Sequence, residues 1–220
     1  MTVKIYESAL SNEVLDMLLN FFNSNTHLHY DTMGMKKIIE PWQHVQHILE
    51  PILSKYFPTN TNLGDNFYKH NFPYFTHIDS RNNKNSYNVL IPLYLSENTN
   101  QKFVIFDQYC TDYSGATWLG DIWKPESEFI SNKKRDFPYK DETVIGCTDK
   151  PISDDMYEVL KYDYRNEEQF FGLTGIAYDY KPGNILVFPS NQLHCTGRMD
   201  CEYKIGLSLR FEILDKNHIL

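Results

Sequence analysis

The chain has 220 residues, of which 41% are hydrophobic and 15% aromatic, which suits one compact globular domain and argues against a disordered protein. A formal charge of −8 and a pI near 5.4 argue against a nucleic-acid partner, because phosphate binding requires a basic surface. No apolar run approaches the ~20 residues that cross a bilayer, and the first ten residues lack a signal-peptide core, so we expect a cytoplasmic protein without a membrane partner.

The first 60 residues are predicted to form a helical part of the domain. A short strand at 3–6 precedes a helix that Ser11 can cap, and apolar residues recur at helical spacing over 14–22. A second helix is expected to start near Pro41, because proline is tolerated in a first turn. Pro51 lies within this helix, off its apolar stripe, and is expected to kink it.

From Asn66 onward, short segments rich in aromatic and β-branched residues alternate with turn residues, which predicts strands. The predicted strands are 67–69, 87–95, 102–106, 175–180, 185–188 and 203–211. Helices followed by such strands indicate an α+β, mainly β, domain whose sheets form a sandwich or barrel. Residues 107–171 have weak periodicity apart from a predicted helix at 154–162, and we expect this insertion to form a lid over the functional end.

An H-x-D motif at His77 and Asp79 is the main functional signal. Residues two apart on a strand share a face, so the two side chains can offer a nitrogen and an oxygen to one metal ion. The third ligand is expected to be His194, which a bend at 189–191 would place at the mouth of the sheet rather than within it. Two histidines and one carboxylate form the facial triad of non-haem Fe(II) oxygenases, which leaves open positions for co-substrate and O2.

Other potential ligands are less consistent with a metal site. His44 and His47 adjoin the apolar stripe of the second predicted helix and lack a third partner. His70 lies an odd number of residues from His77, so strand parity disfavours it, and Cys195 would face away from His194 into the core.

An H-x-D motif alone is weak evidence, because such a motif is more often part of a surface loop or a core. Its surroundings are more specific. In chain order the sequence contains PYFTHID (73–79), NVLIPL (88–93), KPGNILVFP (181–189) followed by His194, and KIGLSL (204–209). Over residues 66–212, this ordered set resembles the 2-oxoglutarate/Fe(II)-dependent oxygenase superfamily, specifically its prolyl-hydroxylase-like and small phage-type members.

The resemblance implies a single oxygenase domain over 1–220, with a double-stranded β-helix (jelly-roll) core at 66–212 and N-terminal helices packed on it. It also implies Fe(II) as the metal and 2-oxoglutarate as the co-substrate. In the family, a buried cation about ten residues after the second histidine holds the distal 5-carboxylate. Lys204 lies ten residues beyond His194 and is the first candidate.

This chain departs from the commoner Arg-x-Ser pattern, because Lys204 is followed by Ile205 and Gly206. The departure leaves Arg210, which has the same strand parity as Lys204, as a second candidate, with a surface ion pair as its equally weighted alternative. Three polar residues are lesser candidates for co-substrate contacts: Ser208 through its hydroxyl, Tyr68 toward the 5-carboxylate, and Asn88 toward the 1-carboxylate. Tyr68 and Asn88 could equally be ordinary packing or turn residues.

The activity that the resemblance implies is O2-dependent hydroxylation of a small molecule or of an amino-acid or peptide side chain. A cupin-like metal-dependent isomerase or epimerase and a non-catalytic jelly-roll binding module are the alternatives, and stoichiometric succinate release separates them from the oxygenase. In the insertion, Tyr113, Trp118 and Trp123 suit an apolar or sugar-like substrate, with packing of the insertion onto the sandwich as the alternative. After the H-x-D motif, Arg81 and Lys84 could receive an anionic group.

Overall fold

A computed structural model describes residues 3–25, 29–30, 36–39, 41–59, 61–73, 76–79, 86–110, 144–160 and 172–212. Their elements, in chain order, are β1 (Lys4–Tyr6), α1 (Asn12–Ser24), β2 (His29–Tyr30), β3 (Lys36–Ile39), α2 (Trp42–Leu53), β4 (Asn62–His70), β5 (Ser86–Leu95), β6 (Lys102–Cys110), β7 (Val144–Ile145), α4 (Asp154–Leu160), β8 (Gly175–Asp179), β9 (Ile185–Pro189), β10 (Gln192–Thr196) and β11 (Lys204–Glu212). The predicted class, mainly β with antiparallel sheets and N-terminal helices, is confirmed.

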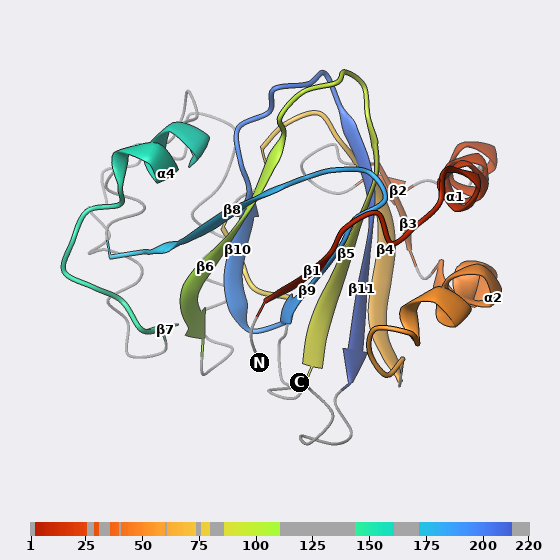
Figure 1. The fold of residues 1–220 in the computed structure, drawn as a ribbon, viewed down its shortest axis with the longest axis horizontal. Helices are drawn as coiled ribbons and strands as arrows, with labels where there is room; N and C mark the ends of the chain where they lie inside the picture. The colour runs from red at the N-terminus through yellow and green to blue at the C-terminus, as the bar shows by residue number, and fades with distance from the viewer. Residues whose placement is uncertain are drawn as a thin grey trace.

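Two antiparallel sheets form the core of the molecule (Figure 1). The larger sheet has the strand order β1-β9-β5-β11-β4-β3-β2, and the smaller one has β10-β6-β7 with β8 also paired to β6. In Figure 1, α1 and α2 lie beside the larger sheet, and α4 lies on the far side of the smaller one. Among the described residues, no helix has both the length and the apolarity that a bilayer span requires.

The two N-terminal helices cover the outer face of the larger sheet. Ser11 caps α1 by accepting a hydrogen bond from the Val14 amide, and Pro41 occupies the N-cap of α2, as expected. Pro51 lies inside α2. The buried apolar residues of both helices, including Leu18 and Leu49, pack with the outward-facing residues of β4, β5, β9 and β11.

Alternation along β11 separates a dry outer face from a polar inner face. Ile205, Leu207, Leu209 and Phe211 belong to the core beneath the helices. The intervening residues face the other sheet, because successive side chains on a strand point to opposite faces. These residues are Lys204, Gly206, Ser208 and Arg210.

The smaller sheet buries its outer face against α4. Met156 and Leu160 of this helix pack with Val104, Phe106 and other outward-facing residues of the sheet. The predicted helix in the insertion is thus present, and it lies on the outer face rather than over the inner one. Residues 111–143 and 161–171, the rest of the expected lid, lie outside the described residues, so the lid remains a prediction. Tyr113, Trp118, Trp123, Arg81 and Lys84 also lie outside them.

Several strands differ from the prediction. β4 begins at Asn62 and β6 extends to Cys110, so both are longer than expected. The first 60 residues also contribute β2 and β3 to the larger sheet. The placement of His194 at the mouth of the sheet was wrong: a bend at Ser190 leads directly into β10, where His194 pairs with Ile105 of β6.

Candidate metal centre

The three predicted ligands meet between the two sheets. The backbones of His77 and His194 form a reciprocal bridge, with each amide donating to the other residue's carbonyl at 3.0 Å. The Asp79 amide donates to the Ser190 carbonyl at 3.0 Å. Backbone hydrogen bonds therefore tie the H-x-D segment to the strand that carries the second histidine.

The ligand atoms lie close enough to share one ion. One nitrogen of each histidine and an oxygen of Asp79 all lie within 4.8 Å of one another. Asp79 Oδ1 is 3.5 Å from His77 Nε2, and Asp79 Oδ2 is 3.3 Å from His194 Nε2. Metal bonds of about 2.0–2.2 Å bring neighbouring ligand atoms to roughly 3 Å, so a small adjustment is sufficient. The donor set fits Fe(II), as the predicted facial triad requires.

A hydrogen bond fixes which nitrogen of His194 can bind metal. Nδ1 lies 2.9 Å from the Gln192 carbonyl oxygen, which can only accept, so Nδ1 carries the proton. Nε2, which faces Asp79, is therefore the nitrogen that would bind the metal.

The carboxyl group of Asp79 is held in its charged form. Burial raises its pKa, but the charges and hydrogen bonds of His194 and His77 outweigh this effect and place the pKa well below its ordinary value. Near neutral pH, Asp79 is therefore already a carboxylate and need not lose a proton before it binds a metal ion.

A cavity of about 100 Å³ extends from the triad into the sandwich. Two of the predicted co-substrate residues, Tyr68 and Ser208, line it. Prediction from the sequence did not identify its other lining residues, which are Asn66, His70, Leu90, Phe103, Phe188 and Thr196. Thr196 lies two residues after His194 on β10 and so shares its face, a signal that was available only once β10 was recognised as a strand.

Lys204 is buried behind this wall, with 1% of its surface exposed. Its Nζ donates to Thr196 Oγ1 at 2.9 Å and lies 4.4 Å from the centre of the Tyr180 ring. Burial lowers the pKa of Lys204 to about 7. Among the described side chains, no carboxylate forms an ion pair with it, so a buried cation without an anion lies next to the cavity.

Two tyrosine hydroxyls meet above Gly206, which lies two residues after Lys204 on β11 and therefore on the same face. Tyr68 Oη and Tyr180 Oη are 3.0 Å apart, and a Cβ added to Gly206 would overlap both. The absence of a side chain at Gly206 therefore makes room for them. Burial raises the pKa of each hydroxyl, so both stay protonated. Tyr180 Oη donates to the Ile205 carbonyl at 3.0 Å, so Tyr68 is the donor to Tyr180.

Arg210 and Asn88 are neighbours across β11 and β5, and neither lines the cavity. The Arg210 guanidinium donates to the backbone carbonyls of Asp79 and Leu63, and no ion pair of Arg210 is found among the described residues. The Asn88 side chain is 1% exposed, and neither of its polar atoms has a hydrogen-bond partner among the described residues.

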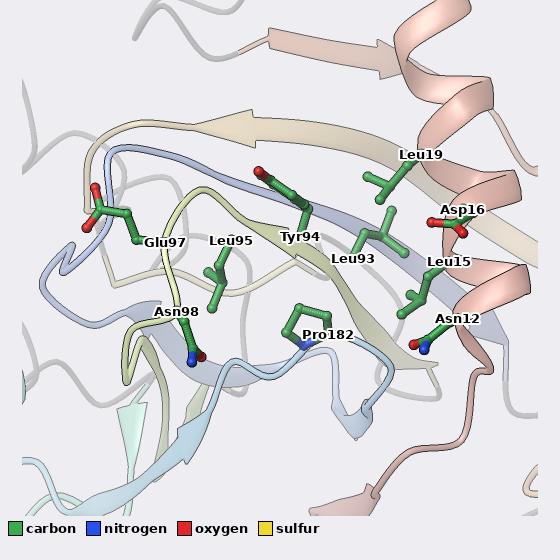
Figure 2. Close-up of a pocket in the computed structure, with 10 residues that line it drawn as sticks. All are labelled: Asn12, Leu15, Asp16, Leu19, Leu93, Tyr94, Leu95, Glu97, Asn98 and Pro182. Carbon is green, nitrogen blue, oxygen red and sulfur yellow. The ribbon is translucent and has the colours of Figure 1, made fainter.

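A larger hollow, of about 340 Å³, lies away from the triad between α1, the end of β5 and Pro182 (Figure 2). Leucines line much of it, and its polar residues are Asn12, Asp16, Glu97 and Asn98. It contains no histidine or cysteine, so it offers no comparable metal site.

The fold is a double-stranded β-helix, and the candidate site places two histidines and a carboxylate between its sheets. No family model matches the chain, and no curated protein matches its sequence. Solved structures do share the fold across nearly the whole chain. The non-haem α-ketoglutarate-dependent carbocyclase SnoK from nogalamycin biosynthesis matches with a TM-score of 0.57 and 8% identity, covering 97% of this chain and 80% of its own.

Two further structures agree. The non-haem α-ketoglutarate-dependent epimerase SnoN, also from nogalamycin biosynthesis, has a TM-score of 0.55 and 7% identity over 96% of this chain and 78% of its own. A prolyl-4-hydroxylase from Pseudomonas putida has a TM-score of 0.53 and 8% identity over 97% of this chain and 93% of its own. The predicted jelly-roll core is therefore confirmed as a fold.

Proposed function

We propose that this protein is a 2-oxoglutarate-dependent oxygenase that holds Fe(II) through His77, Asp79 and His194. The convergence of these ligands within 4.8 Å, at one end of a cavity that leads toward a buried lysine, carries the proposal. Fe(II) with 2-oxoglutarate and O2 supplies the oxidising chemistry, in which the co-substrate becomes succinate and CO2. The residues of this chain would bind and orient the two organic substrates.

Lys204 is the proposed anchor for the 5-carboxylate of 2-oxoglutarate. A buried ammonium is unfavourable unless an anion neutralises it, and the described residues provide none. Thr196 lines the cavity and already accepts a hydrogen bond from Lys204 Nζ, so a carboxylate there could contact both groups. Tyr68 also lines the cavity, and its hydroxyl would donate to the carboxylate in place of its bond to Tyr180.

At the other end of the co-substrate, Ser208 and Asn88 are the proposed polar contacts. Ser208 lines the cavity on the same face as Lys204. The Asn88 carboxamide is buried without a partner among the described residues, which costs about 1–3 kcal/mol when no ligand satisfies it. The 1-carboxylate of the co-substrate is its proposed partner.

An exposed strip beside the metal centre, apolar apart from Asp107 on β6, favours a substrate with an apolar body. Ile176, Tyr109 and Ile145 are 55%, 41% and 39% exposed. Ile176 pairs with Ile105, which pairs in turn with His194, while Tyr109 pairs with Gln192 and Ile145. Cross-strand partners share a face, so the strip continues the surface that carries His194. We propose that it contacts a small molecule or a peptide side chain that is hydroxylated.

The function can be tested by measuring succinate. Protein loaded with Fe(II) without oxygen is mixed with 2-oxoglutarate, O2 and a panel of amino acids, peptides and apolar small molecules. We expect succinate release that depends on one substrate class and that Asp79→Ala abolishes. Succinate reports the oxygenase whether the product is hydroxylated or rearranged. Turnover of a substrate without succinate would instead indicate a cupin-like isomerase, and metal binding without any turnover would indicate a binding module.

A further inference from the structure

Arg210 connects the metal-ligand segment to the larger sheet. Its Nη1 donates to the carbonyl of Asp79, and its Nη2 donates to the carbonyl of Leu63 at 2.9 Å. Gly64 leaves the space that the guanidinium fills, because a Cβ at this position would lie 3.0 Å from Nη2. One rigid, planar group thus connects the start of β4 with the backbone of the proposed metal ligand Asp79.

Asp79 is the ligand that most needs such support. The two histidines hold each other through their reciprocal backbone bridge. The side chain of Asp79 is 30% exposed, compared with 18% for His77 and 3% for His194. Its amide is bonded to Ser190, and among the described hydrogen bonds its carbonyl is held by Arg210.

We propose that Arg210 is a positioning residue for the metal site, which holds the Asp79 backbone so that the carboxylate faces both histidines. It does not anchor the co-substrate, a role that the cavity geometry gives to Lys204, six positions earlier on β11. The inference rests on the proposed metal centre. Groups that orient metal ligands typically change metal affinity by about 10–100-fold when they are removed.

The test uses Co(II) as the probe, added to metal-free protein and followed by its visible absorption spectrum. Arg210→Met should bind Co(II) about 10–100-fold more weakly, with a changed spectrum, because Asp79 no longer holds its orientation. Arg210→Lys should lie between wild type and Arg210→Met, since an ammonium cannot reach both carbonyls in a fixed plane. Gly64→Ala should weaken binding less than Arg210→Met does, because the new methyl group lies 3.0 Å from Nη2 and only shifts the guanidinium.

Arg198→Met is the matched control. It removes the same charge from an exposed arginine paired with Asp200 and should leave Co(II) binding unchanged. At saturating Co(II), 2-oxoglutarate binding to Arg210→Met should change less than the metal affinity does, whereas Lys204→Met should show the reverse pattern.

Wild-type Co(II) affinity and spectrum in Arg210→Met would overturn the proposal. If that variant does not fold, Arg210→Lys decides, and wild-type affinity and spectrum there would equally overturn the proposal. Failure of the wild-type protein to bind Co(II) would instead refute the proposed function itself, so the two failures can be told apart.

Discussion

Replacing Lys204 with methionine should make the metal-free protein more stable, although the residue is fully buried. The pKa of Lys204 falls from 10.5 to about 7 because burial disfavours the ammonium. The folded state therefore holds fewer protons than the unfolded state between these values. Stability of the wild type should then rise with pH through this window, since unfolding takes up a proton.

The size of the effect follows from the pKa shift. A difference of about 3.5 pKa units corresponds to roughly 5 kcal/mol between the two protonation states, and relaxation around the charge would reduce this to about 2–5 kcal/mol. Methionine fills a similar volume and carries no charge, so Lys204→Met removes this cost. The free energy of unfolding of the variant should exceed that of the wild type most at pH 6, and the difference should shrink as pH approaches 10.

Urea unfolding of both metal-free proteins at pH 6 and pH 9 measures this difference. Other titrating groups affect both proteins alike, so their contributions cancel when the wild-type free energy of unfolding is subtracted from that of the variant. Lys102→Met is a suitable control, because Lys102 is partly exposed and paired with Asp179. The same Lys204→Met variant should lose the thermal stabilisation that 2-oxoglutarate gives to metal-loaded wild type. A variant that is destabilised equally at both pH values would show that the buried ammonium carries no such cost, and would refute the reasoning.

Three further predictions concern the same cavity. Binding of 2-oxoglutarate should take up a proton above pH 7, because the anchoring ammonium of Lys204 is lost there. At pH 8 the affinity should be about tenfold lower than well below pH 7. Calorimetry in buffers of different ionisation enthalpy measures both effects. Gly206→Ala should cost about 1–3 kcal/mol in urea unfolding, because its methyl group overlaps two tyrosine hydroxyls, and unchanged stability would contradict this packing. Asn88→Leu should be neutral or stabilising without ligand yet weaken 2-oxoglutarate binding, and unchanged binding would remove Asn88 from the site.

The convergence of His77, Asp79 and His194 could be predicted from the sequence because its signal is local. The two-residue spacing of His77 and Asp79 and the turn before the strand that leads to His194 depend on a few adjacent residues. The alternation along 203–211 likewise placed Lys204 on the inner face, since parity is a property of one strand.

The remaining features depend on contacts between distant segments. β10 consists of Gln192, Leu193, His194, Cys195 and Thr196, a mixed composition that gives little strand signal until β6 pairs with it. Without β10 the role of Thr196 could not be inferred. Arg210 reaches carbonyls 131 and 147 residues earlier in the chain, and no local pattern predicts such a contact.

The reciprocal bridge between His77 and His194 has a consequence for how the protein folds. These histidines belong to segments far apart in the sequence, so the ligand set is complete only after the chain has closed a long loop. A divalent ion at the proposed site would bind this arrangement and not the open chain, so it would act as a reversible cross-link. At a free metal concentration of about 1,000 times the dissociation constant, it would add roughly 4 kcal/mol to the unfolding free energy. Metal supply would thereby change the fraction of chains that are folded as well as the activity of the protein.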